Sequence, residues 1–255
     1  MKKKIMRRVR RFITALTKST PTEDFSDIRA EIGDIVAQVR PYTMTSVPRI
    51  GALVDSVNYA IRRGIPGALV ECGVWRGGSV LAMILTLQRL GVADRDIYLY
   101  DTFEGMTAPT KHDVSAFEAD AMSTWKKAEA RGERPWSSLF AEQFFGEIEI
   151  RQLLMATNYP SERIHLVRGP VEHTLPRTLP KSVALLRLDT DWYESTLHEL
   201  EHLYPQLAPG GVLIIDDYGH WKGCRKAVHE YFNRPGNKLP LLTRVDYTGR
   251  VAVKC

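Results

Sequence analysis

Cysteine is scarce in this chain of 255 residues: only Cys72, Cys224 and Cys255 are present, and none is paired at a metal-binding spacing. This scarcity excludes a disulfide framework and favours a reducing compartment, so we expect a cytoplasmic protein. No apolar run approaches the roughly 20 residues that a membrane-spanning helix needs. Internal repeats and low-complexity tracts are also missing. What remains, with 44% hydrophobic and 25% charged residues, is typical of a soluble globular protein.

The positive charge of the chain is concentrated at one end. The formal net charge is +5, from 35 Lys and Arg against 30 Asp and Glu. Residues 1–20 hold eight of the bases and no acid, so the remainder has 35 − 8 = 27 bases against 30 acids, a net charge of −3. The body of the protein is therefore mildly acidic, and we expect no nucleic-acid partner.

The basic arm, residues 1–25, allows two interpretations. Between residues 4 and 17, apolar side chains recur at helical spacing among the cations: Ile5, Val9, Phe12, Ile13 and Leu16. Such a basic amphipathic helix can lie on an anionic membrane, which would place the protein at the inner face of that membrane. Alternatively, the arm frays or packs against another subunit, as chain termini commonly do. We expect the protein to form a homo-oligomer.

Two helical patterns precede the first strong strand and predict an N-terminal helical cap over residues 26–66. From residue 67 onward, apolar runs alternate with helical patterns, which is typical of a parallel sheet wrapped by helices. The expected strands are 67–74, 96–103, 163–171, 182–191 and 211–219. The expected helices are 26–39, 47–63, 77–91, 141–156, 195–207 and 222–232.

The predicted fold class is therefore α/β, with a Rossmann-like core over residues 67–255 and a final hairpin over 240–254. The apolar runs are short, continuous and partly β-branched, as in strands covered on both faces. A long polar stretch at about 107–140 interrupts the alternation, and we expect it to form a lid. In open parallel sheets ligands bind beyond the carboxyl ends of the strands. Polar residues follow all five expected strands, so the active site is expected there.

The first expected strand runs into ECGVWRGGS, a glycine-rich turn before a helix. Gly73 permits a sharp turn, and Ser79 can cap the helix that follows. A dinucleotide-binding loop would have the pattern GxGxxG, but Trp and Arg occupy its middle here. Glu71 would repel a pyrophosphate, whereas it suits the ammonium group of S-adenosylmethionine. The segment therefore favours S-adenosylmethionine over a dinucleotide.

Asp101 ends the second expected strand, where a carboxylate can accept hydrogen bonds from both ribose hydroxyls. A lone Asp at a strand end equally suits a turn or a cap. Its combination with the glycine-rich segment favours the cofactor role. Phe103 and the turn from Gly169 to Val171 are placed to flank the adenine.

Four carboxylates follow two further strands: Asp189 and Asp191 after one, and Asp216 and Asp217 after the other. In a partly buried cleft their repulsion requires either protonation or a bound cation. Ligands that are all oxygen favour a hard ion, Mg²⁺ first, with Mn²⁺ or Ca²⁺ as alternatives. The acids could otherwise cap the helices that follow, but a cap needs one acid and not two.

A metal at this position would prepare a hydroxyl for methyl transfer. Binding two vicinal hydroxyls to Mg²⁺ lowers the pKa of the attacking one, and a nearby group must then take the proton. The candidates for that base are Asp191, His220 and His198. We also expect Tyr218 and His220 to contact the acceptor.

At these motifs the chain resembles the macrocin-type sugar O-methyltransferases over roughly residues 40–235. The matching segments are IPGALVECGVWRGGS, YDTFEGM, RIHLVRGPVEHTLP, LLRLDTDWYEST and LAPGGVLIIDDYGHWKGCRKAV. The resemblance implies a class I methyltransferase fold, S-adenosylmethionine and Mg²⁺. Carried over position by position, it assigns the metal to Asp189, Asp216 and Asp217, the base to Asp191, and the cofactor to Glu71, Gly73, Ser79 and Asp101, with Thr43 and Met44 covering it.

The expected function is therefore the S-adenosylmethionine- and Mg²⁺-dependent methylation of a sugar hydroxyl, in a glycosylated natural product or a glycan with vicinal hydroxyls. A catechol or another vicinal diol would suit the same chelation. A scaffold that binds the cofactor without catalysis is the alternative from another class. Residues 1–25 and 107–140 match the family poorly, so the sequence does not identify the acceptor.

Overall fold

The computed structural model describes residues 30–140 and 146–255, and residues Glu31–Cys255 form one compact unit. The basic arm at 1–25, with its predicted amphipathic helix, lies outside the described residues. Within the described part of the chain, none of the helices has the length and apolar character needed to cross a membrane. The membrane contact and the homo-oligomer stay predictions.

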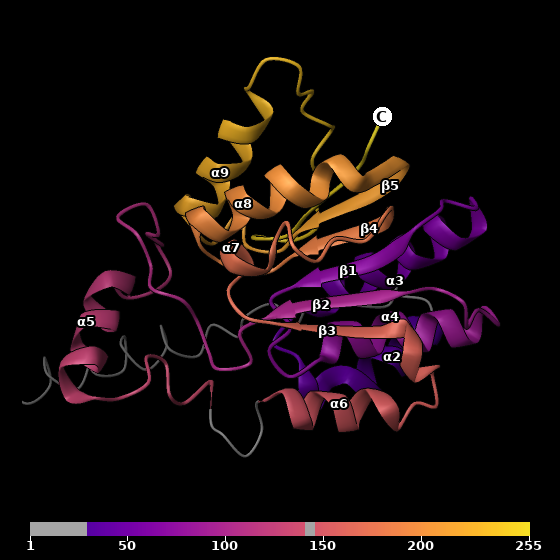
Figure 1. Cartoon of the computed structure of the whole chain (residues 1–255), viewed down its shortest axis with the longest axis horizontal. Helices are drawn as coiled ribbons and strands as arrows, with labels where there is room; N and C mark the ends of the chain where they lie inside the picture. Colours follow the sequence, from indigo (N-terminus) through magenta and orange to yellow (C-terminus); the bar gives the residue numbers. More distant parts are fainter. Residues whose placement is uncertain (1–29, 141–145) are drawn as a thin grey trace, which may run out of the picture. The chain divides into compact units, whose positions relative to one another are not determined.

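A seven-stranded sheet forms the centre of the fold, in the order β3-β2-β1-β4-β5-β7-β6 (Figure 1). Strands β1 to β5 pair in parallel, and β7 joins β5 as an antiparallel strand. The strands are β1 (Ala68–Cys72), β2 (Ile97–Asp101), β3 (Ile164–Arg168), β4 (Val183–Leu188), β5 (Leu207–Ile215), β6 (Thr243–Arg244) and β7 (Arg250–Val253). The predicted α/β class, its five parallel strands and the C-terminal hairpin are confirmed.

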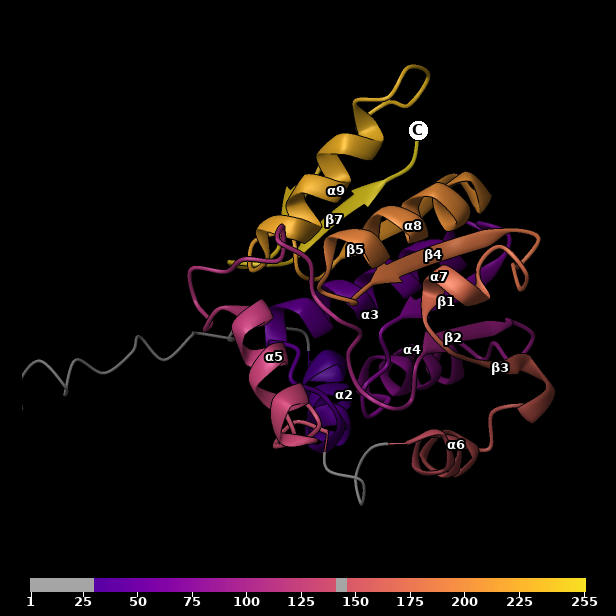
Figure 2. The ribbon, with the colours of Figure 1, turned by 60° about the vertical axis from the view of Figure 1, so that its left-hand side comes forward.

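Helices cover both faces of this sheet (Figures 1 and 2). On one face α3 packs against α4 and beneath β4 and β5, and α4 also contacts α6; on the other face α8 packs between α7 and α9. The helices are α2 (Ala30–Val39), α3 (Val47–Arg62), α4 (Gly78–Arg89), α5 (Ala121–Arg131), α6 (Glu147–Met155), α7 (Val171–Thr174), α8 (Tyr193–Leu203) and α9 (Lys222–Phe232).

Every residue of the two central strands β1 and β4 is buried, as their continuous apolar runs predict. Two of these residues are charged: Glu71 in β1 and Arg187 in β4. They are direct register partners on neighbouring strands. Because burying a charge is costly unless it is paired, this position has to be an ion pair.

The structure differs from the predicted elements in two places. The helix expected over residues 195–207 is α8, which ends earlier, at Leu203, and Pro209 and Gly210 beyond it lie inside β5. The register of β5 against β4 shifts in this region, which accommodates the two residues within the strand. The expected lid, residues 107–140, contains the helix α5, which is not among the expected helices. Asp120 caps α5, because Oδ1 of Asp120 accepts a hydrogen bond from the backbone N–H of Ser123 at 2.7 Å.

Candidate active site

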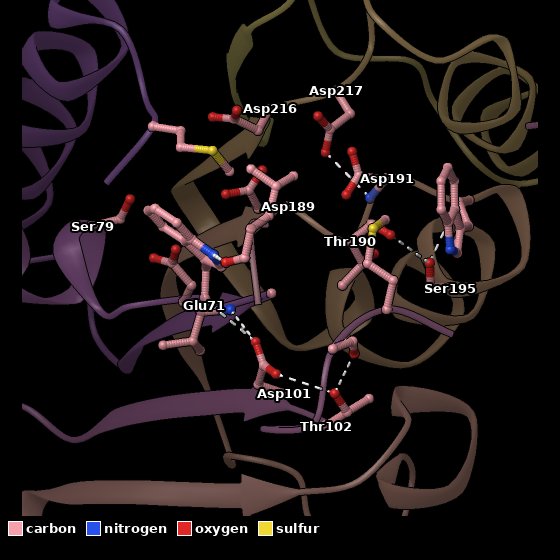
Figure 3. Close-up of a pocket in the computed structure, with 18 of the residues that line it drawn as sticks. Glu71, Ser79, Asp101, Thr102, Asp189, Thr190, Asp191, Ser195, Asp216 and Asp217 are labelled. Carbon is pink, nitrogen blue, oxygen red and sulfur yellow. Dashed lines mark hydrogen bonds between the residues drawn. The ribbon is translucent and has the colours of Figure 1, made fainter. Parts of the chain in front are cut away.

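A cavity of about 460 Å³ opens beyond the carboxyl ends of β1, β2, β4 and β5 (Figure 3). Most of the residues predicted for the site line it together: Thr43, Met44, Glu71, Gly73, Ser79, Asp101, Gly169, Val171, Asp189, Asp191, Asp216, Asp217 and His220. Phe103 and Tyr218 are not among the described residues that line this cavity. The polar residues at the strand ends thus converge on one cavity, whereas Phe103 and Tyr218 lie outside its lining.

Gly73 sets the turn between β1 and the glycine-rich segment. Its φ of +82° lies in the left-handed region, and a Cβ there would collide with the backbone carbonyl of Asp189. The next two backbone N–H groups, of Val74 and Trp75, both donate to Oδ2 of Asp101, at 2.6 and 3.1 Å. The end of β2 therefore holds the turn after β1, and the close approach of β1 to β4 is possible only without a side chain at Gly73.

Asp101 lines the cavity and also organises its floor. Its Oδ1 accepts a hydrogen bond from the backbone N–H of Phe103 at 2.7 Å, and Oδ2 holds the turn after β1. Burial raises the pKa of Asp101, although these backbone hydrogen bonds act to lower it. Oδ2 already accepts two hydrogen bonds, so the predicted contact with a ribose hydroxyl would use the second lone pair of Oδ1, which among the described residues has only Thr102 Oγ1 nearby at 3.5 Å.

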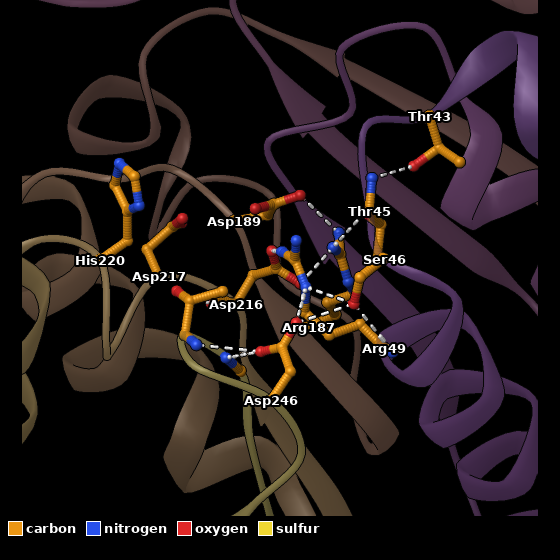
Figure 4. A network of polar contacts seen from close by, with 12 residues as sticks. Thr43, Thr45, Ser46, Arg49, Arg187, Asp189, Asp216, Asp217, His220 and Asp246 are labelled. Carbon is orange, nitrogen blue, oxygen red and sulfur yellow. Dashed lines mark hydrogen bonds and ion pairs between the residues drawn. The ribbon is translucent and has the colours of Figure 1, made fainter. Parts of the chain in front are cut away.

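Arg187 is the centre of the polar network, and its side chain is only 1% exposed (Figure 4). Nη1 donates to Oε1 of Glu71 at 2.5 Å and to Oδ2 of Asp189 at 2.7 Å. Nη2 donates to Oδ1 of Asp216 at 2.6 Å and to Oγ1 of Thr45 at 3.2 Å. A single guanidinium therefore connects the carboxylate expected at the cofactor with two of those expected at the metal.

Glu71 keeps one acceptor for a ligand. Its Oε2 is buried and has no hydrogen-bond partner among the described residues. Burial raises the pKa of Glu71 to about 8, while the ion pair with Arg187 acts to lower it. An unpaired buried carboxylate oxygen is costly, so a cationic donor such as an ammonium group fits this position.

Asp189, Asp216 and Asp217 converge. One carboxylate oxygen from each lies within 4.8 Å of the others. Burial raises the pKa of Asp189 to about 6 and raises that of Asp217 well above its usual range, and the neighbouring carboxylates add to both shifts. A divalent ion among three converging carboxylates would relieve this repulsion, and an all-oxygen donor set matches the preference of Mg²⁺. The residues present thus fit the predicted ion.

Asp191 is held beside this cluster in an unusual conformation. Its φ of +67° lies in the left-handed region, which is rare for a residue other than glycine. The backbone N–H donates to Oδ2 of Asp217 at 3.3 Å, and Oδ1 accepts a hydrogen bond from Nε1 of Trp221 at 2.6 Å. Burial raises the pKa of Asp191 to about 7, and the charge of Asp189 adds to the shift. This arrangement leaves Oδ2 able to accept a proton near neutral pH.

Glu199 on α8 supports the turn that carries Asp191. It is fully buried, and its Oε1 accepts a hydrogen bond from Oγ1 of Thr190 at 2.9 Å. Burial raises the pKa of Glu199 well above its usual range. Sequence reasoning gave no role to this residue, because helical spacing alone does not show which face of α8 meets the turn.

Aromatic side chains form part of the cavity wall. The rings of Trp192 and Trp221 meet edge to face at 4.8 Å, and Trp136 of the insertion packs against Trp192 at 5.8 Å. His220 lines the cavity as predicted, and its Nδ1 lies 3.0 Å from the hydroxyl of Tyr247. Burial lowers the pKa of His220. The insertion at 107–140 therefore supplies part of this wall.

Two predicted residues have other neighbours. The Tyr218 hydroxyl lies 2.8 Å from Nε2 of His229, and the guanidinium groups of Arg225 and Arg250 lie over the Tyr218 ring. His198 contacts the backbone carbonyl of Leu175 and is not among the described residues lining the cavity. Of the candidate bases, Asp191 and His220 are therefore the two that line it.

Fold and cavity together define a class I methyltransferase: a seven-stranded α/β sheet with its polar site at the carboxyl ends of the parallel strands. The solved structure of the O-methyltransferase NovP has the same architecture, with a TM-score of 0.68 and 30% sequence identity over 84% of this chain and 82% of that one. Residues 4–253 match the family described as macrocin-O-methyltransferase (TylF). The chain belongs to this family and is an S-adenosylmethionine-dependent O-methyltransferase.

Three similar proteins are O-methyltransferases by name. A tetracenomycin 4′-O-methyltransferase from Streptomyces olivaceus, whose named substrate carries a dimethoxy-rhamnosyl group, is 35% identical over 82% of this chain and 74% of its own. The mycinamicin III 3″-O-methyltransferase of Micromonospora griseorubida is 32% identical over 76% of this chain and 72% of its own. The demethyldecarbamoylnovobiocin O-methyltransferase of Streptomyces niveus is 30% identical over 74% of this chain and 67% of its own.

Proposed function

We propose that this enzyme transfers the methyl group of S-adenosylmethionine to a sugar hydroxyl of a glycosylated small molecule, with the aid of Mg²⁺. One observation carries the proposal: Glu71, the three converging carboxylates and Asp191 line a single cavity. The names of the relatives, all O-methyltransferases of natural products, support a hydroxyl acceptor.

The cofactor would lie over the ends of β1 and β2. The unpaired Oε2 of Glu71 suits the ammonium group of the methionyl moiety, and Asp101 suits the ribose hydroxyls. Thr43, Met44 and Ser79 line the same part of the cavity, where they would close over the cofactor. Gly169 and Val171 line the side where the adenine is expected.

Asp189, Asp216 and Asp217 would hold the metal ion. When bound, Mg²⁺ would lower the pKa of the acceptor hydroxyl and fix its direction. Asp191 takes the proton of the attacking hydroxyl on Oδ2, because Trp221 already occupies Oδ1. As the new bond from oxygen to the methyl carbon forms, the bond from sulfur to that carbon breaks, so the products are the methyl ether, S-adenosylhomocysteine and protonated Asp191.

The aromatic wall supports an acceptor with apolar faces. Trp136, Trp192 and Trp221 surround the space beside Asp191, and a sugar ring presents its C–H faces to such indoles. Aromatic residues also exclude water, which strengthens the electrostatic interactions at the reacting oxygen. The indole rings and the carboxylates together would align the hydroxyl with the methyl group.

The direct test is an activity assay with purified enzyme, S-adenosylmethionine and matched panels of glycosides, their aglycones and simple catechols. Mass spectrometry should find one added methyl group on a glycoside, in Mg²⁺ but not in EDTA. Asp191→Asn should lose turnover and keep cofactor binding, whereas the exposed Glu129→Gln should behave like wild type. Methylation of catechols alone, or full turnover in EDTA, would contradict the proposal.

A further inference from the structure

Arg49 of α3 contacts Asp216, a carboxylate that Arg187 also binds (Figure 4). Its Nη1 forms an ion pair with Oδ2 of Asp216. Its Nε donates to Oδ2 of Asp246 at 3.0 Å and to Oγ of Ser46 at 3.2 Å. One guanidinium therefore bridges an expected metal ligand and a second carboxylate, Asp246, that lines no part of the expected metal site.

Both oxygens of Asp216 are consequently occupied by guanidinium groups: Oδ1 by Nη2 of Arg187 and Oδ2 by Nη1 of Arg49. An ion shared with Asp189 and Asp217 needs one of these oxygens. A guanidinium and a divalent cation on the same carboxylate oxygen would repel each other strongly. Withdrawal of one arginine would relieve this repulsion when the ion binds.

The two arginines differ in their freedom to move. Arg187 is 1% exposed and is held by four neighbours in the middle of the sheet. The Arg49 side chain is 14% exposed and has a second carboxylate already in contact. Rotation of its guanidinium away from Asp216 leaves it paired with Asp246, so its charge stays compensated.

Asp246 is held in position to stay paired with the Arg49 guanidinium. Its Oδ1 accepts hydrogen bonds from the backbone N–H groups of Thr248 and Gly249, at 2.9 and 2.7 Å, and Oδ2 accepts one from Oγ of Ser46 at 2.7 Å. Burial acts to raise the pKa of Asp246, but these hydrogen bonds and the Arg49 charge outweigh it and lower the pKa. The carboxylate is thus fixed and ionised beside Arg49.

We propose that Arg49 is an internal counter-ion of the metal site, which pairs with Asp216 in the metal-free protein and with Asp246 alone once the ion is bound. The inference rests on the metal assignment made under the proposed function. Arg49 is a positioning residue that competes with the ion for Asp216. Asp246 favours metal binding, because it receives the guanidinium that the ion displaces.

This arrangement predicts opposite effects for two variants. Arg49→Met removes the competitor and should tighten Mg²⁺ binding by about tenfold. Asp246→Asn keeps an oxygen for the turn but removes the charge that receives Arg49, so Mg²⁺ should bind about three- to tenfold more weakly. In the Arg49→Met background, Asp246→Asn should change little, since no guanidinium remains to be received.

The experiment is calorimetric titration of Mg²⁺ into the metal-free full-length chain, without cofactor or acceptor, for wild type, both single variants and the double variant. Arg40→Met is the matched control: it removes a cation shortly before α3, but among the described residues the Arg40 side chain donates only to the backbone carbonyl of Thr45, so affinity should stay within about twofold. Asp189→Asn should abolish the heat of Mg²⁺ binding, which would show that the ion binds at the site containing Asp189. Circular dichroism confirms that each variant is folded, and Arg49→Lys, which retains the charge, should show a smaller gain.

The outcomes separate the two proposals. If wild type releases no heat of Mg²⁺ binding, the metal assignment fails. If wild type binds Mg²⁺ at the Asp189 site but Arg49→Met binds it equally or more weakly, the counter-ion role of Arg49 is overturned. The counter-ion role is also overturned if Asp246→Asn weakens Mg²⁺ binding by the same factor in the wild-type and Arg49→Met backgrounds. The counter-ion role is supported if Arg49→Met binds Mg²⁺ more tightly than wild type and if Asp246→Asn has little effect on Mg²⁺ affinity in the Arg49→Met background.

Discussion

Glu71 and Arg187 lie opposite each other on the neighbouring strands β1 and β4, and both side chains are 1% exposed in an ion pair of 2.5 Å. The pair stands at the centre of the sheet, directly below the cavity. Arg187 also donates to Asp189 and Asp216, so the carboxylate proposed to bind the cofactor and two of those proposed to hold the metal share one guanidinium. A single buried cation therefore links the two proposed sites.

Arg187→Met should destabilise the protein by about 3–5 kcal/mol, because it leaves buried carboxylates without their partner. Arg187→Lys should recover only part of this loss, since a lysine cannot bridge four acceptors in the same plane. Urea denaturation in EDTA measures both values. A stability within about 0.5 kcal/mol of wild type for Arg187→Met would contradict the central role of this residue.

Glu71→Gln should weaken the binding of S-adenosylhomocysteine by about ten- to hundredfold, the range expected for losing a charged hydrogen bond to the ammonium group. Binding of Mg²⁺ should change much less, because Glu71 is not one of the three converging carboxylates. Calorimetry measures both affinities. Glu147→Gln, on the surface helix α6, is the control for loss of one acid. Equal cofactor affinity in wild type and Glu71→Gln would exclude the proposed ammonium contact.

Gly73→Ala should cost at least about 2 kcal/mol more than Gly91→Ala. Both glycines have positive φ, +82° and +69°, so the backbone strain of the two substitutions is similar. They differ in space: an added Cβ at Gly73 meets the backbone of Asp189 and Thr190, whereas at Gly91 it meets nothing within 4 Å. Thermal or urea unfolding of the two variants isolates the contact, and equal losses would show that β1 and β4 can separate freely.

The metal-free protein should lose stability as the pH rises from about 5 to about 8. Burial raises the pKa of Glu71 to about 8, of Asp191 to about 7 and of Asp189 to about 6. A carboxyl group whose pKa is raised in the folded state binds its proton more tightly there than in the unfolded chain. Its contribution is therefore complete below the unfolded pKa and is lost as the pH passes the folded pKa.

Scanning calorimetry across this range measures the effect. Added Mg²⁺ should flatten the decline in Tm, since an ion bound only by the folded state stabilises it and replaces the missing protons. A Tm that rises with pH in EDTA would contradict the raised pKa values. A decline of the same steepness in Mg²⁺ would mean that the ion does not reach these carboxylates.

Much of this fold could be predicted, because four of the five parallel strands contain a short continuous apolar run followed by a polar residue. The site followed from the same feature, since parallel strands end at one edge. Arg187 was missed, although a charge inside VALLRL was a visible signal. Its meaning depends on β4 lying beside β1, and local sequence patterns do not fix strand order.

Other differences arise from side-chain direction. Tyr218 follows Asp217 directly, yet its ring packs on Arg225 and Arg250 and not in the cavity, because β5 ends at Ile215 and the chain turns at Tyr218. Arg49 and Asp246 are almost 200 residues apart in sequence, and only the packing of α3 against the β6–β7 turn brings them together. Sequence patterns alone contain no signal for that contact.

The most direct measurement of the central claim is anomalous diffraction from crystals grown with Mn²⁺ and S-adenosylhomocysteine. We predict one strong peak about 2.2 Å from oxygens of Asp189, Asp216 and Asp217, the distance expected for carboxylate ligands of such an ion. The ammonium group of the cofactor product should lie against Oε2 of Glu71. A cavity without a peak, or a peak only at the other cluster of possible ligands, His198, Glu201 and His202, would contradict the account.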